Sequence, residues 1–416
     1  MKKNIMGTCF FYSIIILCAC SFKKNSKTRI VYVNPEIGIH QTAITKKIIS
    51  RYEKINKNAF IDFQSGGNPD KILSMIASGT QLDVFYGYLS IYDYIARNSI
   101  IDLAPLIKKN EINFNDYYRI GIASCTYKNS IYGMPIQLSG YNIAYNKTLL
   151  LENNLPLPPR EWTLEEFIGY LKKLNSLNPC KEGKEKIFIL PSIVFGHFFE
   201  ALGMYDAENG CIDIRKKDDL LRLCRTLQEL NTQIPSSAEI GETYQAAGSP
   251  GAVFSMKKCY LYYTPTWVLG EFMNIRDFDW DIVKPPYFNG YKKHVIGLSY
   301  LSIPAISRQR DSAFDFIKYY ISKTASDLFA SRRNGMCARI DSTRKFFIPP
   351  PANIASCLET LEESVPKYQP VKGQREHFIK FGPYMDHFRK GGISIEKLYE
   401  EIIRTAGDSI EKIRAE

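Results

Sequence analysis

The first part of the sequence alternates between short apolar runs and segments with helical spacing. The runs at 29–33, 59–63 and 83–86 are rich in Ile, Val, Phe and Tyr, which is typical of buried strands. Residues 41–57 place apolar side chains three and four positions apart, and 68–79 begin with Asn-Pro, a pair that favours a helix start. Strands that alternate with helices in this way predict a parallel sheet and an α/β fold.

The same alternation continues through the rest of the chain. We predict strands at 139–145 and 251–256 and a helix at 163–174 with a Thr as its N-cap. Further helices are predicted at 313–321 and, as an amphipathic pair, within 375–416. A chain of 416 residues, 45% of them hydrophobic, is long enough for two or three such domains.

The N-terminus has the features of an export signal. Two lysines precede an apolar stretch at 5–17, and Leu-Cys-Ala-Cys at 17–20 resembles the bacterial lipobox. The resemblance implies that residues 1–19 are a lipoprotein signal peptide, that Cys20 is acylated, and that residues 20–28 form a tether.

The alternative interpretation is an uncleaved membrane helix, because residues 4–22 carry no charge and are barely long enough to cross a bilayer. Both interpretations place residues 21–416 outside the cytoplasm. No second apolar run approaches the length of a membrane span.

Composition and motifs argue against several classes of function. The net charge is +11, but no basic run exceeds three residues, so we predict a solvated basic surface and no nucleic-acid partner. Five histidines and no Cys-x-x-Cys argue against a metal site, and the common nucleotide-binding and hydrolase motifs are absent. We therefore predict no cofactor and no metal.

Seven cysteines remain after position 20, and an odd number leaves at least one free or paired between chains. A disulfide between Cys180 and Cys211 is possible, and so is one between Cys211 and Cys224. Most of the seven are expected to be small buried apolar side chains. The seven are Cys125, Cys180, Cys211, Cys224, Cys259, Cys337 and Cys357.

Five short blocks, in order, resemble the extracellular solute-binding proteins of family 1, the maltodextrin-type proteins that serve ABC sugar importers. They include Ser-Gly-Thr-Gln-Leu-Asp-Val, Tyr-Gly-Met-Pro, Tyr-Asn-Lys-Thr-Leu-Leu and Pro-Pro-Arg-Glu-Trp-Thr. The resemblance covers about residues 28–416 and is weakest over 175–245. Cys337 departs from it, because the family often has Pro there. The blocks lie at 76–86, 132–135 with 145–150, 155–167, 251–256, and 297–304 with 335–339.

The resemblance implies a periplasmic-binding-protein-like fold of type II: two α/β lobes joined by a hinge, with a ligand cleft between them. The chain is expected to cross to the second lobe near 137–141 and to return near 287–297. The implied N-terminal lobe is 29–138 plus about 295–340, and the implied C-terminal lobe is 139–294 plus about 341–416. Closure of the hinge would trap the ligand.

Candidate ligand-binding residues of the first lobe lie where its strands end. Gln64 ends the second strand, and Tyr86 and Tyr88 follow the third, where the family's first-lobe contacts lie. Gln137 stands at the expected crossing. Amide groups suit the hydroxyl edges of a sugar, and aromatic rings suit its apolar faces. Asp83 is expected to hold its own loop.

The second lobe is expected to supply a stacking aromatic after the 251–256 segment, where the family usually has one. Tyr260, Tyr262 and Trp267 share that prediction. Tyr300, in the returning segment, is a further candidate. Trp162 is expected to pack in the core. Phe195 and His197 are expected in the core or at the surface, with a place in the cleft as the alternative.

The sequence thus predicts a lipid-anchored, non-enzymatic, monomeric receptor on the extracellular face of the cytoplasmic membrane. It would bind a carbohydrate, most simply an oligosaccharide, and deliver it to the permease subunits of an ABC importer. The alternative from another class is a secreted glycan-degrading lipoprotein, a glycoside hydrolase, which would need two carboxylates facing one cleft. A sensory or adhesive role for the same fold also stays open.

Overall fold

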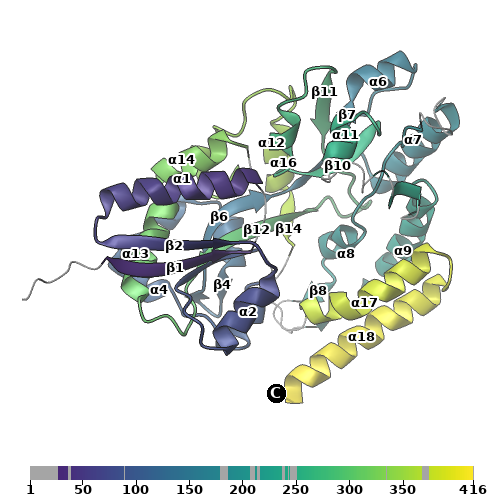
Figure 1. Cartoon of the computed structure of the whole chain (residues 1–416). Helices are drawn as coiled ribbons and strands as arrows, with labels where there is room; N and C mark the ends of the chain where they lie inside the picture. The colour runs from purple at the N-terminus through teal and green to yellow at the C-terminus, as the bar shows by residue number, and fades with distance from the viewer. Residues whose placement is uncertain are drawn as a thin grey trace, which may run out of the picture.

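The computed structural model describes residues 27–35, 39–88, 90–178, 186–206, 211–212, 216–236, 239–241, 243, 251–333, 335–367 and 374–415. The predicted signal peptide, Cys20, most of the tether and Cys180 lie outside these residues. The described residues form two bodies that lie side by side, each with its own sheet (Figure 1).

The larger sheet has seven strands in the order β13-β6-β12-β3-β1-β2, with β14 paired to β12. Strands β1 and β2 are parallel, as are β1 and β3, whereas β12 runs antiparallel to β3 and β6. The strands are β1 (Thr28–Asn34), β2 (Ala59–Ser65), β3 (Val84–Gly87), β6 (Met134–Ser139), β12 (His294–Ser302), β13 (Met336–Cys337) and β14 (Ser364–Pro366).

Helices around this sheet bury Ile and Phe side chains against it, and α1 runs alongside β1 and β2 (Figure 1). Asn68 caps α2 as predicted, because its side chain accepts a hydrogen bond from Lys71 N. The elements are α1 (Ile39–Ile55), α2 (Pro69–Ala77), α3 (Tyr92–Ile95), α4 (Ala104–Lys109), η1 (Phe114–Asp116), α5 (Arg119–Ser124), β4 (Thr126–Tyr127), β5 (Ser130–Ile131), α13 (Arg310–Tyr320), α14 (Lys323–Ser331) and α15 (Ile340–Thr343).

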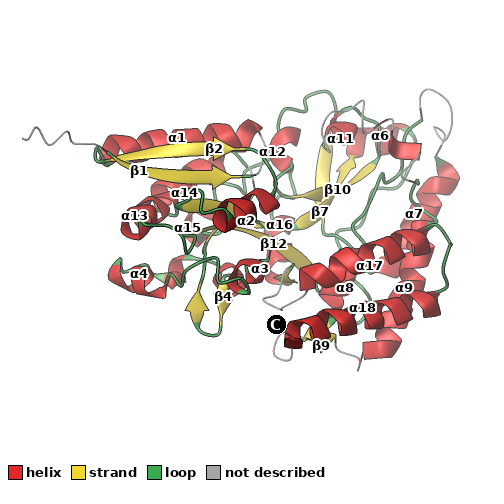
Figure 2. Cartoon of the chain, turned by 60° about the horizontal axis from the view of Figure 1, so that its bottom comes forward, coloured by secondary structure: helices red, strands yellow, loops and turns green. Residues whose placement is uncertain are grey.

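The smaller sheet has three strands in the order β10-β7-β11, with both outer strands antiparallel to β7. Helices α7, α9, α17 and α18 lie at the end of the molecule far from β1 and β2 (Figure 2). The elements are β7 (Tyr141–Asn146), α6 (Lys147–Glu152), α7 (Leu164–Leu177), α8 (Gly196–Leu202), β8 (Tyr205–Asp206), β9 (Cys211–Ile212), α9 (Lys217–Asn231), α11 (Ala252–Ser255), β10 (Leu261–Pro265), α12 (Leu269–Phe272), β11 (Trp280–Val283), α16 (Ser356–Glu362), α17 (Gln374–Arg389) and α18 (Ile395–Ala415).

The chain passes from the larger to the smaller sheet at Gly140, the one residue between β6 and β7. It returns between β11 and β12, over residues 284–293. A hydrophobic cluster holds the two sheets together here, with Leu138 from β6, Ala144 from β7 and Ile296 from β12. The strands therefore change sheet at these two points, while the exact limits of the two lobes stay a prediction.

Most predicted elements are confirmed, but the strand at 251–256 is wrong. The chain forms the short helix α11 there, with Ser255 N bonded to Gly251 O and with Val253 and Phe254 buried. A short apolar run has too few residues for its period to distinguish a buried strand from a buried helix. The predicted strand at 139–145 is the end of β6 and most of β7, divided by Gly140.

Two structural predictions are confirmed by burial. Asp83 is buried and holds its own loop, because its carboxylate accepts hydrogen bonds from Val31 N and Ser307 Oγ. Trp162 is buried against Phe167, and its indole N–H donates to Lys284 O.

The described cysteine side chains are apolar core residues. Cys125, Cys224, Cys259, Cys337 and Cys357 are all free and buried. Cys224 is a free thiol, so the structure does not support the possible Cys211–Cys224 disulfide, and the side chain of Cys211 lies outside those described.

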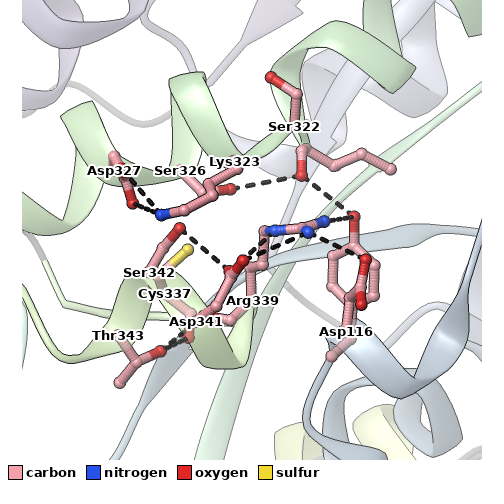
Figure 3. A network of polar contacts seen from close by, with 12 residues as sticks. Asp116, Ser322, Lys323, Ser326, Asp327, Cys337, Arg339, Asp341, Ser342 and Thr343 are labelled. Carbon is pink, nitrogen blue, oxygen red and sulfur yellow. Dashed lines mark hydrogen bonds and ion pairs between the residues drawn. The ribbon is translucent and has the colours of Figure 1, made fainter.

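Arg339 centres a polar network at the start of α15 (Figure 3). Its guanidinium bonds Asp116 Oδ2 and Asp341 Oδ1, each at 2.9 Å. In the same region Lys345 Nζ lies 2.7 Å and Lys323 Nζ 3.0 Å from the carboxylate of Asp327. These pairs fasten α15 to η1 and α14, which fixes the edge of the larger sheet beside β13.

Candidate functional site

The passage at Gly140 holds polar and aromatic side chains of both bodies. Tyr141 is the first residue of β7 and pairs with Pro265 of β10. The next residue, Thr266, donates its backbone N–H to Gly140 O at 2.9 Å. These bonds place Trp267 beside the passage, and its side chain is 39% exposed.

Two aromatic rings and an imidazole pack together next to the passage. The rings of Tyr141 and Tyr263 stack at 5.0 Å with an angle of 10°, because the two residues are diagonal neighbours on β7 and β10. The ring of His197, on α8, lies 4.3 Å from that of Tyr141, and its Nδ1 lies 2.8 Å from the Tyr263 hydroxyl. Burial lowers the pKa of His197 well below its ordinary value, so the imidazole is neutral at pH 7.

Glu200 follows His197 by one helical turn and is 5% exposed. Burial raises its pKa to about 8, and the positive charge of Lys367 only partly opposes that rise. The negative charge of Glu200, when present, raises the pKa of Tyr141 and of Tyr263, beyond the effect of their burial. At neutral pH the carboxyl is therefore mostly protonated and can both donate and accept a hydrogen bond.

Four buried polar atoms around the passage have no hydrogen-bond partner among the described residues. Buried polar atoms normally have one, since leaving one unpaired costs about 1–3 kcal/mol. The four atoms have almost no solvent contact in this conformation, so a molecule with several hydroxyl groups would supply the missing partners only after the surrounding side chains move aside. The four atoms are Ser139 Oγ, His197 Nε2, Glu200 Oε2 and Thr266 Oγ1.

Three of the predicted first-lobe residues lie together. The Tyr86 hydroxyl donates to Gln137 Oε1 at 3.1 Å, and the ring of Tyr88 lies 6.4 Å from that of Tyr86. Gln137 is two residues before Ser139, so this group approaches the passage from the side of the larger sheet. Gln64 lies farther away, at the end of β2, with β1 between it and β3. Tyr88 and Gln64 are half-buried, whereas Tyr86 and Gln137 are buried.

The predicted aromatic residues of the second group lie in different surroundings. Tyr260 is fully buried, and its hydroxyl donates to Asn178 Oδ1 at 3.1 Å. Tyr262 packs near Phe254 and Phe272. Of the three residues predicted to share the stacking role, Trp267 alone has an exposed ring.

Tyr300 is 1% exposed and packs edge-on against Phe85 in the core of the larger body. In this conformation the ring of Tyr300 has no face free for stacking, and unlike the polar atoms at the passage it lies within an apolar core. We therefore no longer count Tyr260, Tyr262 and Tyr300 among the candidate binding residues. Trp267 remains the candidate for stacking on a ligand.

Sequence reasoning missed Tyr141, Tyr263 and Glu200 and left His197 undecided. Tyr141 adjoins the predicted crossing, which was a usable signal. Tyr263 differs from the predicted Tyr262 by one position, and that step reverses the face of a strand on which a side chain lies. Among the described residues no group of His, Cys, Asp and Glu is placed to hold a metal ion.

The arrangement of two α/β bodies joined by crossing strands, with polar groups gathered at the crossing, defines a binding-protein fold of the type II periplasmic class. Residues 47–331 match the family described as Bacterial extracellular solute-binding protein, and the chain belongs to that family. The predicted family resemblance and fold class are thus confirmed. Comparison with curated protein sequences gives no match.

Solved structures of similar fold come from several bacteria. An ABC substrate-binding protein of Listeria monocytogenes, in complex with cycloalternan, has a TM-score of 0.80 at 18% identity over 93% of this chain and 100% of that chain. The GacH receptor of Streptomyces glaucescens, solved unliganded and with acarbose, has a TM-score of 0.73 at 14% identity, over 92% and 99%. The maltose/maltodextrin-binding domain MalE of Bdellovibrio bacteriovorus, bound to maltotriose, has a TM-score of 0.71 at 16% identity, over 92% and 100%.

No helix within the described residues is both long enough and apolar enough to cross a membrane.

Proposed function

We propose that this protein is the lipid-anchored, extracellular substrate-binding component of an ABC importer for a carbohydrate, most simply an oligosaccharide. The ligand binds between the two lobes at the Gly140 passage, and closure of the lobes presents it to the permease subunits in the membrane. Cys20 carries the lipid, and the receptor acts as a monomer without a cofactor.

One observation carries the proposal of a carbohydrate. The exposed Trp267 directly follows Thr266, whose N–H bonds Gly140 O, and four buried polar atoms without partners lie around the same passage. A sugar offers an apolar ring face to the indole and hydroxyl groups to polar atoms. The similar structures named above hold maltotriose, cycloalternan and acarbose, which supports the same ligand class for this fold.

The positions of the groups suggest how closure and binding are linked. Trp267, His197 and Glu200 belong to the smaller body, whereas Ser139 ends the last strand of the larger body before the passage. A ligand that bonds to both sides gains its full set of hydrogen bonds only when the lobes approach. The ligand then stabilises the closed form over the open one.

A thermal-shift screen against a panel of oligosaccharides tests the proposal. A ligand at 100 times its Kd stabilises the folded protein by about 2.7 kcal/mol, which is a rise of a few degrees in Tm for a chain of this size. Trp267→Ala should abolish the rise for the ligand that binds best. Leu177→Ala, an apolar truncation at an exposed position at the end of α7, serves as the control and should keep it.

The rival hydrolase makes a different prediction for the same sample. If the pure protein cleaves the bound oligosaccharide, chromatography of the incubated ligand shows shorter products, and the receptor proposal is wrong. Recovery of intact ligand together with a thermal shift supports a receptor.

A further inference from the structure

The outward face of α1 carries only basic charges. Its buried side, with Ile44, Ile48 and Tyr52, packs on the larger sheet. The opposite side and the turn into β2 are exposed, and we name these residues the basic face. The basic face consists of Lys46, Lys47, Arg51, Lys54, Ile55, Lys57 and Phe60.

The cations of the basic face have no acidic partner among the described residues, unlike Lys109 and Lys323, which pair with Asp311 and Asp327. Nearby carboxylates are engaged elsewhere. Glu53 accepts from Ile61 N at 2.9 Å. Likewise Asp62 pairs with Arg29, and Asp315 accepts from the Tyr52 hydroxyl at 2.8 Å.

Like charges four positions apart destabilise a helix, and Lys47 and Arg51 have that spacing. Nothing in the packing of α1 requires basic residues at these exposed positions. The unpaired charge is therefore available to an external partner with negative charge.

Two apolar side chains complete the face. Ile55, at the end of α1, is 73% exposed, and Phe60, on the edge strand β2, is 47% exposed. A surface that joins lysines and arginines to an exposed aromatic and an exposed aliphatic side chain is typical of binding at the headgroup region of a bilayer.

The basic face lies where the chain enters the fold. Thr28, the first residue of β1, donates its N–H to Asn58 O at 2.7 Å, and Asn58 directly follows Lys57. Figure 1 shows the end of α1 next to the start of β1. Residues 20–28 span at most about 30 Å when fully extended. A lipid at Cys20 would thus hold the basic face within that distance of the bilayer.

From these observations we propose that the basic face docks on a membrane surface that bears anionic lipid headgroups. The inference rests on the proposed anchor at Cys20 for its geometry, and it goes beyond ligand binding. The lipid and the basic face then act together, and they hold the larger lobe against the bilayer.

Vesicle sedimentation tests the surface directly. The protein is the chain without residues 1–20, which keeps every described residue and removes the lipid. The vesicles are phosphatidylcholine alone, or phosphatidylcholine mixed with phosphatidylglycerol. The variant is Lys46→Glu, Lys47→Glu, Arg51→Glu and Lys54→Glu together, with the corresponding Gln changes as a milder second variant.

A matched control changes the same number of exposed, unpaired cations on the other body. It combines Lys147→Glu, Arg160→Glu, Lys173→Glu and Lys390→Glu. The control alters the net charge equally, so it separates a specific face from a general effect of charge. Thermal unfolding and the oligosaccharide thermal shift are measured on every variant.

We expect the protein to sediment with the anionic vesicles, to be released by salt, and to stay in solution with phosphatidylcholine alone. The variant on the basic face should lower the partition coefficient by about tenfold or more, and the control should leave it nearly unchanged. Absence of binding to anionic vesicles, or an equal loss in both charge-reversal variants, would overturn the proposal. The ligand-induced thermal shift should persist in all of them, which keeps this test independent of the proposed function.

Discussion

The Nδ1 atom of His197 lies 2.8 Å from the hydroxyl oxygen of Tyr263. Because burial keeps the imidazole neutral, one ring nitrogen carries a proton and donates a hydrogen bond, while the other nitrogen accepts a hydrogen bond. The role of Nδ1 in the bond to Tyr263 thus decides whether the second nitrogen, Nε2, donates a hydrogen bond to a ligand or accepts one. It also fixes the ring beside Tyr141, at the point where the chain passes between the two sheets.

Tyr263→Phe should therefore lower both stability and affinity. The substitution keeps the ring that stacks on Tyr141 but leaves His197 Nδ1 buried without its partner, at a cost of about 1–3 kcal/mol. Urea unfolding measures the loss. Tyr141→Phe is the control, because no described residue bonds to its hydroxyl, and its effect on stability should be much smaller. Equal stability of both variants would contradict the role assigned to the bond.

Glu200 makes stability depend on pH. Its folded pKa of about 8 exceeds the ordinary 4.5, so between these values the folded state binds more protons than the unfolded state. Stability from this group is fully present below about pH 4.5 and is lost as the pH rises toward 8, with a slope of about 1 kcal/mol per pH unit.

Glu200→Gln should remove that slope and make the protein more stable than the wild type above pH 8. Urea unfolding at several pH values between 5 and 9 checks it, with the exposed Glu165→Gln as control. A wild-type curve that is flat from pH 5 to 8 after subtraction of the Glu200→Gln curve would contradict the raised pKa.

Lys284 is a buried charged residue at the point where the chain returns to the larger sheet. It follows β11, is 7% exposed, and its Nζ lies 3.5, 3.4 and 3.2 Å from carboxylate oxygens of Glu161, Glu359 and Glu363. Burial alone would lower its pKa, but the bonds to Glu363 and the neighbouring carboxylates raise it, so the side chain stays charged.

Lys284→Met should destabilise the protein by about 1–3 kcal/mol in urea unfolding, less than for a fully buried pair because the carboxylates are partly exposed. Lys292→Met is the matched change in the same network, and since Lys292 is largely exposed its loss should be smaller. If Lys292→Met loses more unfolding free energy than Lys284→Met, the burial of Lys284 is not the reason that this network stabilises the protein.

The sequence was most informative where its period was long and unambiguous. The helix from Leu164 to Leu177 begins at Thr163 as predicted, because the capping box with Glu166 is a local signal that needs no tertiary context. The segment at 251–256 carries no such signal, and packing of Val253 and Phe254 decided its conformation.

The site was harder to predict, for a geometric reason. His197 and Glu200 lie within 175–245, where the family resemblance is weakest, and nothing local marks either residue as functional. Among the aromatics, the sequence placed several near the expected cleft but does not say which face of a strand points to it. In the structure Trp267 is exposed and stays a stacking candidate, whereas Tyr260 and Tyr300 are buried and do not.

The central claim is that a carbohydrate binds at the Gly140 passage between the two sheets. A crystal structure with the oligosaccharide that gives the largest thermal shift tests it most directly. The account predicts a sugar ring stacked on Trp267, with hydroxyl groups bonded to Glu200 and His197. A sugar bound with full occupancy elsewhere, and no contact with these three residues, would contradict it.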